Sequence, residues 1–250
     1  MRTIDLNCDL GEIPLRIERG LDEQIMDIVT SVNIACGGHA GDEDTMLATV
    51  RAAHQRGLAI GAHPSYPDRP NFGRQELQMA PDELVDAILA QLLALSRVVR
   101  SCGAVLHHVK PHGALYNVAA RDPEIAEAVA AACARFGQDV ILVGLAGSPM
   151  LAVCRAAGFR VVGEGFVDRR YEADGTLRPR HLEGALLTPA EAEIQALRLA
   201  EREEAVTLSG QVISVSAQTL CLHGDGPLAP EVATTVHRAL TSVGVAVRPF

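Results

Sequence analysis

Short apolar runs alternate along the chain with longer segments in which apolar residues recur at helical spacing. The short runs predict β-strands at residues 2–7, 31–36, 58–63, 104–110, 140–145, 160–166, 212–222 and 245–249. The longer segments predict helices, because a capping residue or a proline opens most of them and a glycine closes them. These helices cover 42–56 and 81–101, then run from Asp122 to Gly137, from Ser148 to Gly158, from Thr188 onward and from Pro230 to Gly244.

Strands that alternate with single helices predict βα units and a parallel sheet. Polar clusters follow six of the predicted strands and precede none, at residues 7–12, 36–42, 62–69, 110–117, 164–171 and 222–226. In parallel α/β folds the carboxyl ends of the strands carry the ligand site. Clusters from the whole chain converge most easily on a closed sheet. We therefore predict an α/β fold with one (β/α) barrel domain over residues 1–250, with seven strands as one option.

Alternate residues of a strand point to opposite faces of the sheet, which indicates how the polar strand residues are oriented. In the first strand one face is apolar and the other carries Asp5, Asn7 and Asp9. If the apolar face packs on helices, the polar face points into the barrel, where unpaired polar groups are costly. We therefore expect Asp5, Asn7 and Asn33 to support a site.

Lys110 is the single lysine of the chain, against 21 arginines. Arginine stays protonated at any biological pH, whereas lysine is a compact charge that can lose its proton when it is desolvated. A lysine-poor composition would also leave one lysine by chance. Lys110, however, directly follows a predicted strand and opens one of the polar clusters, which favours a functional amine.

Charge and composition exclude several classes of protein. The net charge is −9, no basic block occurs and aromatic residues make up 3% of the chain, which argues against nucleic-acid binding. The longest run without charge, residues 140–154, is interrupted by glycine and proline, so we expect no membrane span. The first residues show no secretory signal and the six cysteines form no close pair. We therefore expect a cytoplasmic protein with buried, reduced thiols.

A search for short catalytic motifs limits the reactions that this chain can be expected to catalyse. No Walker A loop, dinucleotide fingerprint or G-x-S-x-G nucleophile elbow is present. Histidines and aspartates after successive strands can bind a metal, but no H-E-x-x-H motif and no cysteine pair occurs, so no required metal is predicted. Arg69, Arg74, Arg169 and Arg170 lie near the same face, either as surface residues or as a clamp for carboxylate or phosphate. The adjacent pair directly after Asp168 favours a clamp.

In this order, the polar clusters resemble those of the LamB/YcsF family. The resemblance rests on DLNCDLGE (5–12), NIACGGHAGD (33–42), IGAHPSYPDR (60–69), NFGR (71–74), HVKPHGALYN (108–117), ILVGLAGS (141–148), FVDRRYEADGTLRPR (166–180) and LCLHGDG (220–226). These motifs span nearly the whole chain. The chain departs from the family at Gly38, where an aromatic residue is expected and the pocket shape would change, and residues 13–27 match no motif.

The resemblance implies a (β/α) barrel related to the glycoside hydrolase/deacetylase superfamily. It also implies ATP-dependent opening of the lactam 5-oxoproline (pyroglutamate) to L-glutamate, together with two further 5-oxoprolinase subunits, B and C. Because this chain has no nucleotide-binding signature, ATP and its Mg²⁺ are expected on the partner subunits. This chain would then bind an activated intermediate and direct water onto it.

On this hypothesis the polar clusters supply acid–base catalysis and substrate binding. The general base for water is one of four carboxylates: Asp9, Glu12, Asp42 or Asp168. Protons are handled by His39, His63 and His112, while Lys110 stabilises negative charge or binds phosphate. The substrate carboxylate is held by Arg74, Arg169 or Arg170, and further substrate or phosphate contacts are expected from Asn7, Tyr116, Asn117, His223 and Asp225.

Two other functions stay open at this point. A stand-alone, metal-dependent deacetylase or amidohydrolase would hold a stoichiometric metal and need no ATP. A non-catalytic subunit that binds a small lactam or sugar would keep its function without the titratable residues. Six converging titratable clusters exceed what binding a small neutral ring requires, so we rank the binding protein last.

Overall fold

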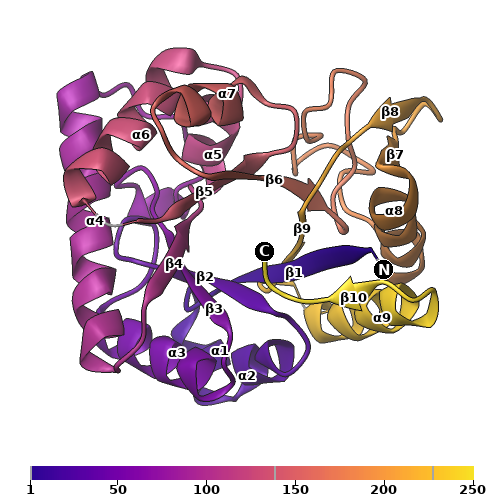
Figure 1. Cartoon of the computed structure of the whole chain (residues 1–250), viewed down its shortest axis with the longest axis horizontal. Helices are drawn as coiled ribbons and strands as arrows, with labels where there is room; N and C mark the ends of the chain where they lie inside the picture. Colours follow the sequence, from indigo (N-terminus) through magenta and orange to yellow (C-terminus); the bar gives the residue numbers. More distant parts are fainter. Residues whose placement is uncertain (1, 138, 227) are drawn as a thin grey trace.

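Seven parallel strands close into a barrel in the computed structural model, which describes residues 2–137, 139–226 and 228–250. The neighbours in the barrel are β1 (Thr3–Leu10), β2 (Ser31–Ala35), β3 (Ala59–His63), β4 (Leu106–Val109), β5 (Ile141–Leu145), β6 (Val161–Phe166) and β9 (Thr219–His223). Pairing of β9 with both β6 and β1 closes the ring. Figure 1 looks down this ring, and the predicted barrel of seven strands is confirmed.

Helices surround the barrel and cover the outer face of its strands (Figure 1). The main ones are α3 (Glu43–Gln55), α4 (Pro81–Ser101), α6 (Pro123–Phe136), α7 (Pro149–Ala156), α8 (Pro189–Arg202) and α9 (Ala229–Ser242). Capping boxes at Asp42 and Thr188 open α3 and α8, because each side chain accepts a hydrogen bond from the backbone N–H three residues on. In the described chain, the helices all lack the length of apolar sequence that a bilayer crossing requires.

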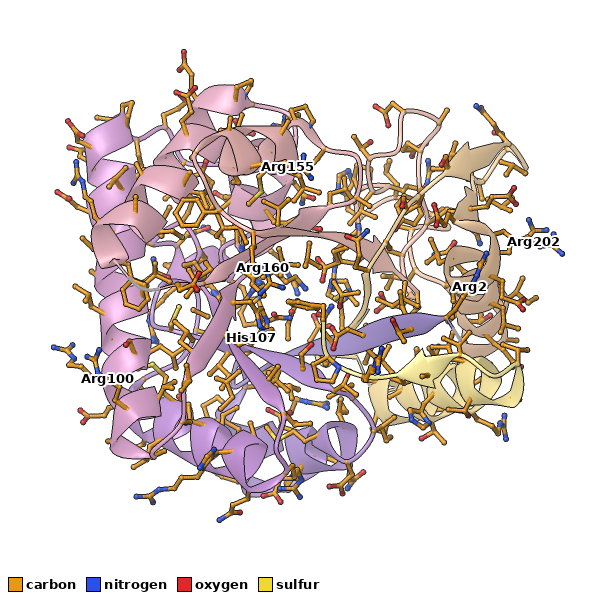
Figure 2. All side chains as sticks on the ribbon, in the orientation of Figure 1. Arg2, Arg100, His107, Arg155, Arg160 and Arg202 are labelled. Carbon is orange, nitrogen blue, oxygen red and sulfur yellow. The ribbon has the colours of Figure 1, made fainter. Side chains whose placement is uncertain are left out.

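The apolar core lies between the outer strand faces and the helices. In α4, Leu84, Ile88, Leu92 and Leu95 recur at helical spacing and are fully buried. Charged side chains point away from this layer, and Figure 2 shows Arg100 and Arg202 at the outside of the molecule. The barrel and its helices therefore form one packed unit.

The inner strand faces carry the polar residues that strand alternation predicts. Asp5 accepts hydrogen bonds from Thr30 and Ser31 at 2.7 Å each and from Thr219. Asn33 donates to the side chain of Asn7 at 2.8 Å. All of these inward groups except Thr30 are buried, and they pair with one another, as buried polar groups usually do.

The amino-terminal end of the barrel has an apolar filling instead. Ile141, Val143 and Val162 form a small cluster against which Phe250 packs. The Phe250 ring lies 5.2 Å from the ring of His107, between centroids, and Figure 2 shows His107 near the centre of the barrel. This end is thus closed by side chains, which leaves the carboxyl ends of the strands for a site.

The predicted strand 212–222 is wrong in its first half. Only β9 belongs to the barrel, while β8 (Val212–Ser214) forms an antiparallel hairpin with β7 (Glu204–Val206). The break falls where Gln218 turns back to the barrel, since its backbone N–H donates to the Gly163 carbonyl and its side chain accepts from the Gly163 N–H. The last predicted strand shortens to β10 (Ala246–Val247), which pairs with the start of β1.

Three short helices and one 3₁₀ turn lie where no element is predicted. They are α1 (Pro14–Glu18), α2 (Leu21–Met26), α5 (Gly113–Ala119) and η1 (Arg69–Asn71). None exceeds seven residues, so each is too short to show a helical period in the sequence. Residues 168–188 form a long irregular connection, with isolated bridges between Arg169 and Leu186 and between Tyr171 and Leu177.

We predict that Gly61→Ala destabilises the barrel. A Cβ atom at Gly61 would lie 2.1 Å from Nε2 of His108, whose ring is buried and donates a hydrogen bond to the side-chain oxygen of Asn33. Overpacking of this kind costs about 1–3 kcal/mol, measurable as the free energy of unfolding in urea. The double variant Gly61→Ala/His108→Ala should lose less than the sum of the single variants, and full additivity would contradict the clash.

A candidate active site at the carboxyl ends of the strands

A cavity of about 700 Å³ opens at the carboxyl ends of the barrel strands. The long connection 168–188 contributes several of its lining residues, among them Leu177, Pro179 and Arg180. Eleven of the predicted site residues also line the cavity: Asp9, Glu12, His63, Arg74, Lys110, His112, Tyr116, Asn117, Arg169, His223 and Asp225. The clusters that are separated in sequence therefore converge on one pocket.

Lys110 lies in the inner wall of this pocket and is 2% exposed. Its ammonium Nζ is 2.9 Å from Oδ1 of Asp9 and 2.9 Å from Oε1 of Glu164. It also donates to the sulfur of Cys221 at 3.1 Å. Burial disfavours the charged amine, but the attraction of the surrounding groups, led by Asp9, outweighs it and raises the pKa of Lys110 well above its ordinary value. The amine is therefore a fixed cation.

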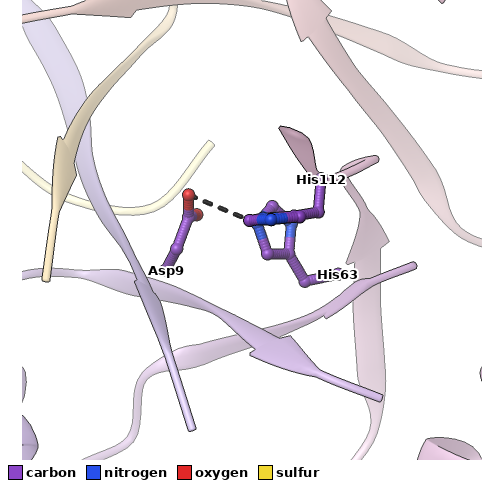
Figure 3. Close-up of side chains that lie close together, drawn as sticks. All are labelled: Asp9, His63 and His112. Carbon is purple, nitrogen blue, oxygen red and sulfur yellow. Dashed lines mark hydrogen bonds and ion pairs between the residues drawn. The ribbon is translucent and has the colours of Figure 1, made fainter. Parts of the chain in front are cut away.

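Asp9 joins this cation to a pair of histidines. Its Oδ1 also accepts a hydrogen bond from Asn33 at 2.8 Å, and its Oδ2 lies 3.3 Å from Nε2 of His63 (Figure 3). Despite burial, His63 and then Lys110 hold the pKa of Asp9 well below its usual range. Nε2 of His63 lies 3.0 Å from Nδ1 of His112. Asp9 is thus a carboxylate next to two imidazoles.

Glu12 and His39 form a second pair beside His112. Nε2 of His39 is 3.0 Å from Oε1 of Glu12, and its ring stacks on that of His112 with 3.6 Å between centroids. Burial, together with the nearby His63, lowers the pKa of His39 to about 2, so this imidazole is neutral. Burial raises the pKa of Glu12 above its usual value. A carboxyl group with a raised pKa is suited to exchange protons near neutral pH.

Asp168 and His223 form a carboxylate–imidazole pair. Nδ1 of His223 is 2.9 Å from Oδ2 of Asp168, and the His223 backbone N–H donates to the same oxygen at 3.0 Å. Burial opposes ionisation, but His223 outweighs it and lowers the pKa of Asp168. Because Nδ1 faces the carboxylate, Nε2 is the ring nitrogen left to act in the pocket, which His223 lines. Asp168 itself is not among the residues that line the cavity.

Arginines supply positive charge to the pocket. Arg169 is buried and its NH2 group donates to the Arg178 carbonyl at 2.6 Å, but its Nε finds no hydrogen-bond partner among the described residues. Burial lowers the pKa of Arg169 to about 10, which leaves it charged at neutral pH. At the rim, Arg74 and Arg180 both bind Oδ2 of Asp225, at 2.7 and 3.1 Å. An anion is thus favoured near Arg169.

Several predicted residues lie outside the pocket wall. Asn7 sits in the barrel interior, where it donates to Glu164 at 2.9 Å. Asp42 is exposed and caps α3 through the Thr45 N–H, and Arg170 binds the Gly184 carbonyl and Glu191, so neither joins the cluster.

Gly38 does not shape the pocket through a missing side chain. It is not among the residues that line the cavity. A Cβ atom there would lie 2.3 Å from Oε1 of Gln91 and 2.4 Å from Oγ of Ser65, so Gln91 fills the space. The side chain of Gln91 in turn accepts a hydrogen bond from the Ser65 backbone N–H and donates one to the Ser65 carbonyl. The expected change of pocket shape at this position is therefore not seen.

Glu164 and Arg180 are site residues that the sequence did not single out as such. Strand alternation places Glu164 on an inward face, but nothing in the sequence pairs it with Lys110. Arg180 lies in the irregular connection, where no periodicity orients a side chain. The cysteines behave as expected, since burial raises the pKa of Cys8, Cys36 and Cys221 and keeps these thiols protonated.

Some of these residues lie close enough together to hold a metal ion. Among the described residues, three sets place their ligand atoms within 4.8 Å of one another: Asp9/His63/His112, Asp9/Cys221/His223 and Glu12/His39/His112. The first set is drawn in Figure 3. All of its members are buried and line the cavity.

Several known proteins are similar to this chain in sequence or in fold. The profile of the LamB/YcsF family matches residues 4–250. The A subunit of the 5-oxoprolinase from Methylococcus capsulatus is 51% identical over 247 residues, covering 98% of this chain and 95% of that protein. The crystal structure of a lactam utilization protein from Thermus thermophilus is similar with a TM-score of 0.91 at 44% identity, covering 99% of this chain and 100% of that one. A T48 deacetylase, with a TM-score of 0.50 at 13% identity over 98% of this chain and 87% of that one, shares the fold alone.

We predict that Lys110→Met destabilises the protein strongly. The substitution leaves the carboxylates of Asp9 and Glu164 buried without their cation, and breaking a buried pair costs about 3–5 kcal/mol. Denaturant unfolding measures the loss. Adding Glu164→Gln removes one of the two uncompensated charges, so the double variant should be more stable than Lys110→Met alone. A double variant that is less stable would contradict the pairing.

We also predict that the contribution of Asp168 to stability disappears at acid pH. Its folded-state pKa is lowered, so its ionised form stabilises the fold above the unfolded pKa of about 4 and this stability is lost as pH falls through the lower folded pKa. The difference in unfolding free energy between the unsubstituted protein and Asp168→Asn should therefore shrink below about pH 4. Asp44→Asn, at an exposed position, controls for the change of side-chain charge. A difference that stays constant with pH would contradict the prediction.

Proposed function

The chain belongs to the LamB/YcsF family, and we propose that it is the hydrolytic subunit of an ATP-dependent 5-oxoprolinase, which opens the lactam ring of 5-oxoproline to give L-glutamate. The observation that carries the proposal is the single pocket that Glu12, paired with His39, and His223, paired with Asp168, line together with an arginine that has an unbonded N–H. The name of the Methylococcus capsulatus relative supports the choice of substrate.

The lactam must be activated before water can open it. A lactam is a stable amide, and phosphorylation of its carbonyl oxygen by ATP turns that oxygen into a leaving group. We assign this step to subunits B and C, which would hold ATP and Mg²⁺, because the sequence of this chain contains no phosphate-binding loop. The relative is named as one subunit of its enzyme, which supports such an assembly. The ATP-dependent complex and the reduced thiols fit a cytoplasmic location.

Glu12 is the residue we propose as general base. It lines the pocket, and burial raises its pKa toward the range in which a carboxylate takes a proton efficiently. In the proposed step, water adds to the activated ring carbon while Glu12 accepts one of its protons. The neutral His39 at 3.0 Å holds the carboxylate in place.

His223 is the residue we propose as proton donor to the ring nitrogen. The C–N bond can break only if the nitrogen leaves as an amine, and the Nε2 of His223 is free to deliver that proton. Asp168 orients the imidazole and stabilises its charged form. Ring opening leaves an acyl phosphate, which a second water hydrolyses to glutamate and phosphate. Lys110 acts on this chemistry mainly by keeping Asp9 ionised, since its N–H groups already face Asp9, Glu164 and Cys221.

The test of this function is reconstitution. The chain is mixed with subunits B and C, and ATP hydrolysis and glutamate formation are measured with and without 5-oxoproline. We expect glutamate only when all three proteins, ATP and 5-oxoproline are present. Glutamate formation that proceeds equally without this chain would overturn the proposal. Glutamate or another amine released by this chain alone, without ATP, would favour the stand-alone amidohydrolase.

We predict that Arg169 binds an anionic group of the substrate. Replacing its buried guanidinium in Arg169→Lys removes the planar N–H donors, and a hydrogen bond to a charged group contributes about 1.5–3 kcal/mol, or roughly 10–100-fold in KM. Arg170→Lys is the matched control, because its side chain binds Gly184 and Glu191 rather than the pocket. Steady-state kinetics of the reconstituted complex check the result, and equal KM values for the two variants would contradict it.

A further inference from the structure

We propose that Asp9, His63 and His112 form a binding site for one divalent transition-metal ion. The inference deepens the proposed function, since it concerns the same pocket. Metal binding can nevertheless be measured on this chain without any substrate or partner. Hydrogen bonds to the backbone fix the two imidazole rings, which lie beside Asp9 in Figure 3.

The backbone determines which nitrogen of each ring carries the proton. Nδ1 of His63 lies 2.7 Å from the carbonyl oxygen of Lys110, and Nε2 of His112 lies 2.9 Å from the carbonyl oxygen of Phe72. A carbonyl oxygen can only accept, so each of these nitrogens must be the N–H donor. In the neutral rings the lone pairs then sit on Nε2 of His63 and on Nδ1 of His112.

These two lone pairs point at the same place. The two nitrogens are 3.0 Å apart, and Oδ2 of Asp9 lies 3.3 Å from the His63 nitrogen. Three acceptors thus converge with no donor between them. Asp9, His63 and His112 are between 1% and 7% exposed, so water does not relieve the repulsion at low cost. A cation placed between the three atoms would turn the repulsion into attraction.

A metal ion fits this arrangement in three respects. Histidines that bind metals usually donate their second ring N–H to a backbone carbonyl or carboxylate, as both rings do here. Two imidazoles and one carboxylate suit Zn²⁺ and its transition-metal neighbours better than Mg²⁺ or Ca²⁺. Three protein ligands also leave a coordination position for water, and all three ligands line the cavity.

The neighbouring groups are compatible with such an ion. Lys110 and Asn33 bind Oδ1 of Asp9, which leaves Oδ2 for the metal. Glu164 offsets the charge of Lys110. Of the competing set Asp9/Cys221/His223, the Cys221 sulfur contacts the Lys110 ammonium and Nδ1 of His223 faces Asp168, so that set is less free to bind.

The metal would explain the position of Glu12. Its Oε1 lies 3.4 Å from Nδ1 of His112, beside the proposed site, and it does not belong to the proposed ligand set. When bound, a zinc ion lowers the pKa of a coordinated water to about 7 and so supplies the nucleophile near neutral pH. Glu12 is then placed to take the proton of that water.

Metal analysis of the full chain tests the proposal. The protein is stripped with a chelator, loaded with ZnCl₂ or CoCl₂ and dialysed. We expect about one Zn²⁺ per chain, a visible d–d absorption with Co²⁺, and a Tm that rises with free Zn²⁺ because the ion binds only the folded state. His63→Ala and His112→Ala should weaken Zn²⁺ binding by at least about 100-fold. His54→Ala, on the exposed surface of α3, is the matched control and should bind normally.

Each result decides for or against the site. Unsubstituted protein that holds no Zn²⁺ or Co²⁺ after loading would overturn it, and a shared proton would then join the two imidazoles. Unchanged binding in folded His63→Ala, or loss of binding in His223→Ala instead, would overturn it as well. If the alanine variants fail to fold by circular dichroism, His63→Gln and the zinc dependence of Tm in the unsubstituted protein supply the answer.

The same experiments separate the metal site from the proposed function. Glu12→Gln should keep its Zn²⁺ while the reconstituted complex loses activity. Full glutamate formation by metal-free protein would overturn a catalytic role for the bound metal and leave the 5-oxoprolinase function intact. Metal binding without glutamate formation would support the metal site and overturn the 5-oxoprolinase function.

Discussion

The ion pairs of Lys110 are the interaction on which the site depends. A closed barrel must fill its interior with side chains from alternate strand residues, and here several of them are charged. Asp9 on β1 and Glu164 on β6 would repel each other in a medium of low polarity, and the ammonium group between them makes their burial tolerable. The carboxylate of Asp9 is thereby held in one place next to His63. The chemistry of the pocket begins from that fixed negative charge.

One end of the barrel is packed for stability, and the other end carries the site. The amino-terminal end is packed by Ile141, Val143, Val162 and Phe250, which need no polar partners. Toward the carboxyl ends the filling becomes a network of Asn7, Asn33 and Asp9 that supports the pocket from below. The strands position the acid–base groups, and the irregular connection 168–188 adds Arg169 and Arg180 to the wall of the pocket.

The barrel and most of its site could be predicted from sequence because the signals are local and repeated. Each polar cluster follows its strand, and the family motifs bring the same residues into one order. Tertiary partners could not be predicted in this way. The alternation that places Glu164 inward does not reveal Lys110 as its partner, and Asp42, which the sequence offers both as a helix cap and as a catalytic carboxylate, acts as a cap in the fold. The β7–β8 hairpin was missed because the run 212–222 contains no glycine, proline or charged residue to mark its break.

The burial of the single lysine has a practical consequence for capturing the assembled complex. Amine-reactive cross-linkers require an accessible lysine side chain, and the one that this chain carries is enclosed by Asp9, Glu164 and Cys221. No lysine side chain on the surface of this protein can therefore be joined to a partner by such reagents. Carboxylate-directed or photoreactive chemistry suits its acidic surface instead, and a lysine introduced at a chosen surface position would be the one accessible lysine side chain of this protein.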